Sequence, residues 1–460
     1  MRKQITGFSI FILVLAIIFA WFRYASADAN FITAFFNSLK VILITIAVLF
    51  IIYYPAIKLI RFWWKKKLTS VDIRNNQKAK SLHRFIQNGN ALIGSITIFY
   101  ALILALLAHI IAPDITPYAN DQINELPFKE PGYSIMILEQ PLELKPGKTG
   151  FVKWLINGKK VDYRQIPITA YRFAGDTIIV ERYIGDGIAG QELHFLMEDI
   201  TGEKLASGEN SKQITKHYIH KKTFLLGTDD LGRDYLSRIL LGIRVSLSVG
   251  VVAVIIALFI GIPLGALAGF YKQYPPFMRL GKKRKFFFPV DGAVMWFINI
   301  VWSIPTLLLV FPIVFAFGQN FYTIFIAVGI TMWVDIARIV RGQVLQVREQ
   351  EFIQAAKTFG YSDGRTIFRH ILPNITGPVI VITAANFAYA ILTEAGLSFL
   401  GIGVQPPAPS WGLMISKYKD NLITEPYLAL IPGFAITILV LAFFMIGNGL
   451  RDALDIKSRL

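Results

Sequence analysis

The stretch EQEFIQAAKTFGYSDGRTIFRHILPN, Glu349–Asn374, is polar and charged, although it lies between two apolar runs that are each long enough to cross a bilayer. Residues 351–359 predict a short helix, and Gly360 follows where a glycine can adopt the left-handed conformation that ends a helix. Ser362 or Asp363 can then cap a second helix. The stretch therefore predicts a helix-turn-helix lying across the membrane face, which is a shape suited to docking.

The composition places the chain among membrane proteins. Of its 460 residues, 54% are hydrophobic and only 17% are charged, and the mean hydropathy is +0.52, which is too apolar for a soluble enzyme of this length. The net charge of +17 suggests nucleic-acid binding at first, but Lys and Arg gather in short loops beside apolar runs, where the positive-inside rule explains them. The sequence has no cysteine, which excludes disulfides, thiolate nucleophiles and Cys-containing metal sites.

Eight apolar runs reach or approach the roughly 20 residues that a helix needs to cross a bilayer. They occupy residues 6–22, 36–59, 90–112, 243–270, 290–318, 322–340, 376–394 and 428–448. The loop at 61–85 has eight Lys or Arg against one acid, and the loop at 272–285 has six against none, so both are predicted to face the cytoplasm, as are the two termini. Residues 113–226 have fourteen Lys or Arg against fifteen acids, a balance expected of a translocated segment.

The first apolar run has two interpretations. Arg2 and Lys3, the apolar core and Ala25-Ser26-Ala27 are also typical of a signal peptide with its cleavage site. Arg23 interrupts the region before that site and favours a retained membrane anchor. Cleavage would leave the predicted sidedness of the rest unchanged, because the second run would still enter from outside and deliver the same basic loop to the cytoplasm.

Residues 113–223 differ in character from the apolar runs around them. Segments such as YSIMILEQPLEL and DTIIVERYI are separated by Pro-Gly, Asn-Gly and Gly-Asp pairs, which is typical of a small β domain. Gly147-Lys148-Thr149 resembles the end of a phosphate-binding loop, but Leu142 stands where that loop requires a glycine. The chain is therefore predicted to bind no ATP itself.

A second notable stretch, LLGTDDLGRDYLSRILLGIRVSLSVG, occupies Leu225–Gly250. Thr228 or Asp229 can cap a helix start there, and Gly232 permits a close approach of backbone. Three charged residues form a predicted collar just before the apolar run: Arg233, Asp234 and Arg238.

Ionisable and amide side chains within spans are costly and are therefore candidates for function. Asp335 and Arg338 are three residues apart on one predicted helix and can pair. Asn386 and Glu394 are about two turns apart and near one face of the seventh span. They either line a transport pathway, or Glu394 lies at the outer interface. Pro305 falls inside the fifth span, where neighbouring helices must compensate for the missing backbone hydrogen bond.

The loop at 349–374 resembles the cytoplasmic loop of the permease subunits of ABC importers, which has the pattern EAA, three residues, Gly and a later Leu-Pro. The corresponding residues here are Gln354-Ala355-Ala356, Gly360 and His370-Ile371-Leu372-Pro373, with glutamine replacing the family's glutamate. The resemblance implies that this loop is the coupling helix, which sits in a cleft of the ATPase subunit. The implied coupling residues are Glu351, Gln354, Ala355, Ala356, Gly360, His370, Leu372 and Pro373. Pro373 can end the second loop helix or start the next span.

The stretch at 225–250 is similar to a signature of the dipeptide, oligopeptide and nickel branch of this family, specifically its C-type subunit. The matching residues at this outer helix start are Gly227, Thr228, Asp229, Gly232, Arg233, Asp234 and Arg238. Leu392–Gly412 and Gly449–Asp455 resemble the same branch, although Asn448 and Ile456 depart from it. The resemblance covers 90–112 and 224–460.

These patterns predict an all-α polytopic membrane protein of about eight helices, with the type I ABC importer fold and an inserted extracytoplasmic β-rich domain. The predicted parts are 1–89, with two additional helices; 90–112, the first core helix; 113–223, the β insertion; and 224–460, the permease core with its coupling loop at 345–373.

The resemblance implies a permease subunit in the bacterial inner membrane that forms the pathway for peptides. It also implies a B-type permease, two ATPase subunits that bind the ATP, and an extracytoplasmic solute-binding protein. No catalytic residue, metal ligand or cofactor is expected in this chain. The alternatives are a permease for nickel or another small solute, and a membrane scaffold or receptor that does not transport.

Overall fold

The computed structural model describes residues 55, 57–62, 77–142, 150–201, 207–272, 277–280, 284–287 and 289–454. The chain divides into two compact units, of which the second comprises residues 101–247 and 404–411 and the first comprises the remainder. The predicted span at 6–22 and most of that at 36–59 lie outside the described residues, as does Gly147-Lys148-Thr149.

The helices in chain order are α4 (Gln77–Gln87), α5 (Gly89–Ile111), α6 (Phe151–Asn157), α7 (Met197–Thr201), α8 (Ser207–His217), α9 (Tyr235–Phe270), α10 (Val290–Ser303), α11 (Thr306–Phe317), α12 (Phe321–Val347), α13 (Glu351–Thr358), α14 (Asp363–Arg365), α15 (Leu372–Phe399), α16 (Trp411–Tyr418) and α17 (Tyr427–Leu454). Short helical turns lie at Pro117–Ala119, Thr366–Ile371 and Lys419–Asn421. The strands are β1 (Tyr133–Pro141), β2 (Tyr163–Ala174), β3 (Thr177–Arg182), β4 (Gln191–Leu196), β5 (Ile219–Phe224), β6 (Phe277–Leu280) and β7 (Arg284–Phe287).

Five helical segments within the described residues are long and apolar enough to cross a membrane, as the hydropathy predicts. They are Gly89–Ile111, Tyr235–Phe270, Tyr322–Val347, Asp363–Phe399 and Tyr427–Leu454. The helices α10 and α11 together form a sixth candidate span.

The prediction of one continuous span over 290–318 is wrong, because α10 and α11 meet at an angle of 93°. The break lies at Ser303-Ile304-Pro305. Pro305 has no N–H to continue α10, and its ring forces the preceding residue out of the helical region. Ile304 accordingly has extended dihedrals, with φ −102° and ψ 126°.

The second loop helix is also not separate from the seventh span. Helical structure runs without interruption from Asp363 to Phe399, and Pro373 lies in the first turn of α15, one residue after its start at Leu372. A π turn at Thr366–Ile371 directly precedes α15, and such turns redistribute backbone hydrogen bonds locally. The π turn lets the helix continue through Pro373, which has no N–H to donate.

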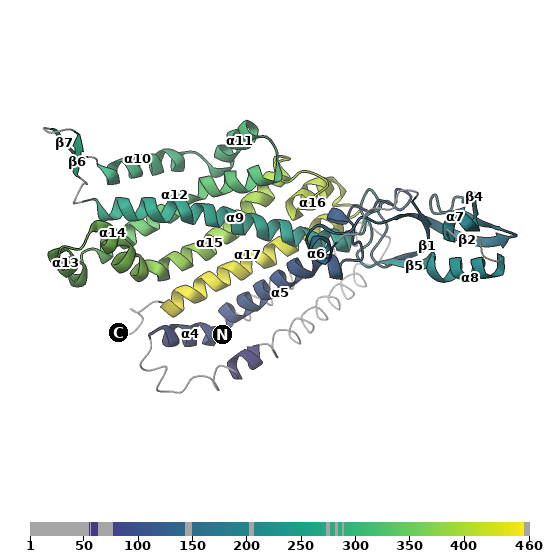
Figure 1. Cartoon of the computed structure of the whole chain (residues 1–460), viewed down its shortest axis with the longest axis horizontal. Coiled ribbons are helices and arrows are strands. Elements are labelled where there is room, and N and C mark those ends of the chain that lie inside the picture. The colour runs from purple at the N-terminus through teal and green to yellow at the C-terminus, as the bar shows by residue number, and fades with distance from the viewer. Residues whose placement is uncertain are drawn as a thin grey trace. The chain divides into compact units, whose positions relative to one another are not determined.

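The first unit is a bundle in which α12 packs on α15, and α15 packs on α17 (Figure 1). A stripe of glycines on α9 lets it approach α12 closely. An added Cβ at Gly261, Gly265 or Gly269 would fall within 3.0 Å of α12 backbone or side-chain atoms. Small residues at a spacing of four are a common device for packing helices in membranes, where burial of apolar surface provides no driving force.

The second unit contains an antiparallel sheet in the order β4-β3-β2-β1-β5, and α7 and α8 pack beside it (Figure 1). Alternating residues Ile178 and Val180 of β3 are fully buried beneath Met197 and Ile214 of these helices. The prediction of a β-rich segment between the apolar runs is confirmed.

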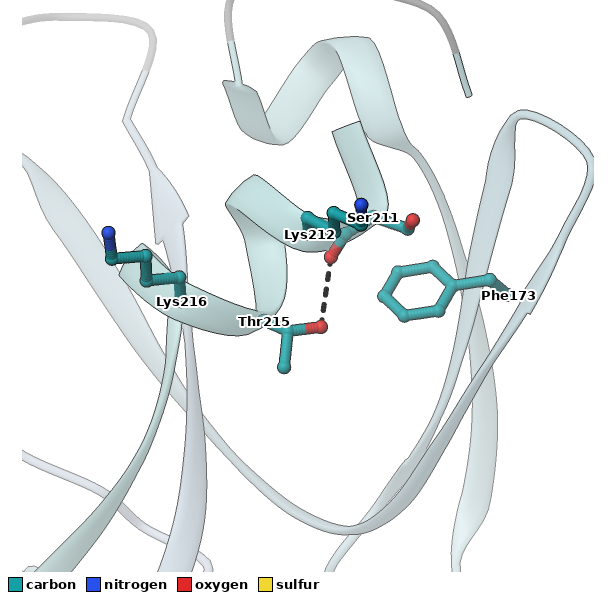
Figure 2. A pocket seen from close by; sticks show the side chains of 5 residues that line it. All are labelled: Phe173, Ser211, Lys212, Thr215 and Lys216. Carbon is teal, nitrogen blue, oxygen red and sulfur yellow. Dashed lines mark hydrogen bonds between the residues drawn. The ribbon is translucent and has the colours of Figure 1, made fainter. Parts of the chain in front are cut away.

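A pocket lies on this sheet between Phe173 of β2 and one face of α8 (Figure 2). Its polar side chains are Ser211, Lys212, Thr215 and Lys216, and the Thr215 hydroxyl donates to the carbonyl oxygen of Ser211 at 2.9 Å. None of the candidate residues from the sequence lines it.

Candidate functional site

The turn after α13 has the conformation that the sequence predicts. Gly360 has φ +73°, its N–H donates to the Lys357 carbonyl at 2.9 Å, and the Tyr361 N–H donates to the Ala356 carbonyl at 3.1 Å. This pair of bonds is the Schellman motif, which satisfies the last carbonyls of a helix. Ser362 caps the following helix, because its hydroxyl oxygen accepts from the Arg365 N–H at 3.4 Å. Both predictions for this turn are confirmed.

The loop has a buried side and an exposed aromatic side. Ile353, Ala356 and Ile371 are buried. In contrast, the exposed fractions of three phenylalanines are large: Phe352 46%, Phe359 78% and Phe368 72%. Exposed aromatic residues gathered on one short segment are typical of surfaces that bind another protein.

Four hydrogen bonds join the loop, the end of α9 and the end of α12. The Arg348 guanidinium donates through Nη1 to the carbonyls of Gly269, at 2.9 Å, and Phe270, at 3.3 Å. These carbonyls belong to the last turn of α9, where no intrahelical donor is available. The Tyr271 hydroxyl donates to Oδ2 of Asp363 at 3.0 Å, and Gln354 Nε2 donates to the Arg348 carbonyl at 3.2 Å.

Burial affects the charged groups of the loop. Partial burial, together with the nearby Arg348 charge, lowers the pKa of Lys357, whose ammonium lies 5.0 Å from the centre of the Phe270 ring. His370 stacks on Tyr361 with ring centres 5.6 Å apart, and the Arg365 guanidinium lies 4.1 Å from the centre of the Tyr361 ring. The loop is therefore held by packing as well as by its backbone.

The eight predicted coupling residues fall into four consecutive places. Glu351, Gln354, Ala355 and Ala356 lie on α13, Gly360 is in the turn, His370 is in the π turn, and Leu372 and Pro373 begin α15. Of these, Ala356 is buried, whereas Glu351, Gln354 and Ala355 are exposed. Sequence reasoning did not find the contacts that Arg348 and Tyr271 make between the loop and the end of α9, because these join residues at least 78 positions apart along the chain.

The second set of residues, at the start of α9, is a buried polar cluster and not an exposed collar. Asp229, Arg233 and Arg238 are all nearly inaccessible. Oδ2 of Asp229 lies 2.7 Å from Arg233 Nε and 3.6 Å from Arg238 Nε. Its other oxygen accepts from the backbone N–H groups of Leu231 and Arg233 at 2.9 and 3.0 Å. One carboxylate therefore balances two buried guanidinium groups.

The segment that follows α5 supplies further partners for this cluster. Arg233 Nη1 donates to Oδ1 of Asn120 at 3.0 Å, and Arg238 Nη1 donates to the Tyr118 carbonyl at 3.3 Å. The Asp114 N–H donates to the Ser237 hydroxyl oxygen at 2.9 Å. These contacts join chain segments more than a hundred residues apart, so no local sequence pattern could have found them.

The prediction that Thr228 or Asp229 caps α9 is wrong. The cap is Asp234, whose Oδ1 accepts from the N–H and hydroxyl of Ser237 at 2.7 and 2.6 Å. Thr228 instead donates its hydroxyl to the Leu126 carbonyl at 2.5 Å. Burial raises the pKa of Asp234, with the Ser237 hydrogen bonds acting in the opposite direction.

The polar residues within the apolar segments have specific surroundings. Asn386 and Glu394 are both buried on α15, so Glu394 does not lie on an exposed surface. Glu394 Oε1 accepts from the Ser398 hydroxyl at 2.7 Å. Among the described residues, Asn386 Nδ2 has no hydrogen-bond partner.

Asp335 and Arg338 do not pair with each other, contrary to the prediction. Both contact Trp302 near the end of α10. The indole Nε1 donates to Asp335 Oδ1 at 3.2 Å, and the Arg338 guanidinium lies 3.6 Å from the ring centre. A cation placed over an indole face is stabilised by the ring's quadrupole, so the aromatic ring competes with the carboxylate for the arginine.

No group of three or more His, Asp or Glu in the described ranges could hold a metal ion. The candidate site consists of the loop at 349–374 and the buried polar cluster at the start of α9.

Comparison with known proteins relates the core to a family of transport components. Residues 261–459 match the family described as binding-protein-dependent transport system inner membrane component. The chain is 42% identical over 233 residues to the dipeptide transport system permease protein DppC of Alkalihalophilus pseudofirmus, covering 51% of this chain and 72% of that protein. It is 40% identical over 238 residues to the oligopeptide transport system permease protein OppC of Bacillus subtilis, covering 52% and 73%.

The glutathione transport system permease protein GsiD of Pectobacterium atrosepticum is 37% identical over 234 residues, with 51% of this chain and 73% of that protein covered. Among solved structures, an inward-facing conformation of the MetNI methionine ABC transporter covers 47% of this chain and 97% of its own, with TM-score 0.39 and 16% identity. From the match of its core and the identity to these permeases, the chain belongs to the family of binding-protein-dependent transport system inner membrane components.

Proposed function

We propose that this chain is a C-type permease subunit of an ABC importer and forms part of the transmembrane pathway for di- or oligopeptides. Support for the peptide class comes from relatives named as dipeptide, oligopeptide and glutathione permeases. ATP hydrolysis belongs to separate subunits, and a solute-binding protein delivers the substrate. The remaining partner in this proposal is a B-type permease that completes the pathway.

The coupling loop is the observation that carries the proposal. It presents Phe352, Phe359 and Phe368 outward while Arg348 and Tyr271 fasten it to the end of α9. The loop also connects α12 directly to α15. A force applied to the phenylalanines would reach three long helices through hydrogen bonds and continuous backbone. ATP-driven closure of the ATPases would thus rock the helices and change which membrane face the pathway opens to.

The proposal places the loop and both termini in the cytoplasm of a bacterial cell, with 113–223 as an extracytoplasmic insertion and 224–460 as the permease core. Asn386 and Glu394 are the proposed pathway residues. Their support is that they are polar and buried among apolar helices, a placement that is costly unless it serves a function or a partner.

The test compares Gly360→Val with Gly364→Val. A Cβ at either position meets no atom within 4 Å, but only Gly360 has positive φ. Valine at 360 is therefore expected to distort the turn without a clash, because a branched side chain strongly disfavours that conformation. Gly364 lies in α14 with no such constraint and serves as the matched control.

We expect Gly360→Val to reach normal membrane levels, because the apolar spans that drive insertion are unchanged. Co-purification of the ATPase subunits and peptide uptake should both be lost, while Gly364→Val should retain both. Gly360→Ala should be intermediate, with a cost on the order of 1 kcal/mol. Normal uptake by Gly360→Val at wild-type abundance would show that this loop is not the coupling element.

A further inference from the structure

Helix α6 in the second unit presents a continuous apolar surface outward. The exposed fractions of Phe151, Val152 and Ile156 are 65%, 67% and 60%. At 100° per residue these three side chains and that of Leu155 cover one arc of the helix, whereas Lys153 and Asn157 point to the opposite side. A helix that is apolar on its outer side requires a nonpolar environment there.

Arg244 fastens this helix to α5 and α9. The guanidinium donates to the carbonyls of Ile156, at 2.9 Å, and Leu155, at 2.7 Å, which belong to the last turn of α6. It also donates to the carbonyls of Ala105 and Leu106 in α5. Gly158, with φ +78°, follows the last residue of α6. Its backbone lies so close to Ile115 that an added Cβ would be 2.8 Å from the Ile115 carbonyl oxygen. The apolar surface of α6 is therefore held in a fixed position.

The contact with α5 sets the level of α6 along that helix. Ala105 and Leu106 precede the end of α5 at Ile111 by five or six residues, which is roughly 8–9 Å of helix. The last turn of α6 thus lies beside the final part of a membrane-spanning segment and not beyond its end. At this level α5 itself exposes Leu102, Leu106 and Ile110, so the apolar surface of α6 adjoins the lipid-facing surface of a span.

Polar features around α6 match the headgroup region of a bilayer. Lys153, Lys159 and Lys160 are exposed on and just after the helix, where ammonium groups can contact lipid phosphates. Trp154 lies on the same helix, and tryptophan is enriched at membrane interfaces because one end of its side chain is apolar and the other polar.

We propose that α6 is an interfacial helix whose Phe151, Val152 and Ile156 side chains insert into the bilayer surface beside α5, anchoring the β-rich segment to lipid between β1 and β2. The partner is the lipid bilayer, with its phosphate headgroups contacting the three lysines. Helices of this kind place their apolar side roughly 5–10 Å into the boundary between headgroups and acyl chains. The proposal rests on α5 crossing the membrane and does not depend on the transported solute.

The test is spin labelling of single cysteines, for which the wild-type chain needs no prior cysteine removal. Full-length chain carrying Phe151→Cys, Val152→Cys or Ile156→Cys is reconstituted in nanodiscs of phosphatidylethanolamine and phosphatidylglycerol. Collision of each nitroxide with oxygen, which concentrates in lipid, is compared with collision with a polar nickel chelate. Lys153→Cys, at the headgroup level where the polar chelate has access, and Lys216→Cys on α8 are the polar controls, and Ile110→Cys on α5 is the lipid control.

We expect the ratio of oxygen to nickel collisions at 151, 152 and 156 to approach that at 110 and to exceed severalfold that at 153 and 216. A ratio at the aqueous level would overturn the proposal by showing that the apolar surface faces water. Low collision rates with both reagents would also overturn it, because they would show that another protein surface covers α6.

Discussion

Gly232 and Gly360 show how the surroundings of a residue decide the consequence of one substitution. Both have positive φ, +68° and +73°. A Cβ at Gly360 would meet open space, whereas one at Gly232 would fall on the carbonyl of Ile123. The strain of a side chain at positive φ is thus common to both positions, and steric overlap is added only at Gly232.

Gly232→Ala is therefore expected to destabilise the second unit by about 2–4 kcal/mol, combining backbone strain with the displacement of neighbouring backbone. The measurement is the thermal unfolding midpoint and the membrane abundance of the variant beside Gly360→Ala, which should unfold close to the wild type. Equal midpoints for the two alanine variants would refute the steric argument.

Asp229 is the carboxylate shared by two buried arginines, so its charge matters more than its shape. Asp229→Asn keeps the side-chain volume and leaves Arg233 and Arg238 without their shared negative partner. Breaking a buried pair in this way typically costs about 3–5 kcal/mol, and we expect a large drop in unfolding temperature in detergent.

Asp230→Asn is the matched control for that change. The Asp230 side chain is 26% exposed and lies 3.8 Å from Arg233 Nη2, and partly exposed ion pairs contribute roughly 0–1 kcal/mol. Comparable losses from the two variants would mean that the buried geometry of Asp229 has no special importance.

At the scale of elements, Arg348 links the last turn of α12 to the last turn of α9. The planar guanidinium group of Arg348 donates through Nη1 to the carbonyls of Gly269 and Phe270 and through Nε to the Glu349 carboxylate, and the side chain is buried. A lysine ammonium is a compact point donor on a flexible stem, so it does not reproduce this arrangement. The arginine therefore keeps the coupling loop in register with α9.

Arg348→Lys is expected to lose about 1.5–3 kcal/mol from the hydrogen bonds to a charged donor. The ATPase subunits should still co-purify, because the exposed phenylalanines are unchanged, but peptide-stimulated ATP hydrolysis should fall. Arg365→Lys, at an exposed position of the same loop, should behave as wild type. Full stimulation in Arg348→Lys would mean that the contact with α9 carries no coupling.

At the scale of the whole chain, the bent pair α10–α11 decides on which side of the membrane the coupling loop lies. Between the β-rich segment and the loop the chain passes through α9, α10–α11 and α12. If the bent pair crosses the membrane, there are three crossings and the two regions face opposite sides. If the pair re-enters on one side, there are two crossings and both regions face the same side.

We predict that the pair crosses. The six Lys or Arg at 272–285 favour a cytoplasmic position for that segment, and the proposed contact with ATPases requires the loop at 349–374 to lie on the same side. Lys159→Cys should react with an impermeant thiol reagent on intact cells, whereas Arg369→Cys should react only after the membrane is opened. Labelling of both positions on intact cells would support a re-entrant pair and would contradict the proposed contact with ATPases.

The sequence by itself determined the features that depend on local chemistry. Apolar length identified every long helix among the described residues, because a helix that crosses the hydrocarbon core must be apolar over roughly 20 consecutive residues and satisfies its own backbone groups. The Gly360 turn and the Ser362 cap were also predictable, since a helix end needs only its neighbouring residues to satisfy its backbone groups. The same local patterns carried the resemblance to permeases that the comparisons confirmed.

Only the tertiary structure decided the features that join distant segments. The contact of Trp302 with Asp335 and Arg338 and the choice of Asp234 over Thr228 as the cap of α9 depend on competing partners brought together by folding. Arg233 meets Asn120 across 113 residues, and Arg244 meets Leu155 across 89. A buried charge takes whichever donors and acceptors the fold places within hydrogen-bond reach, so its role is undefined until the helices and the sheet have packed.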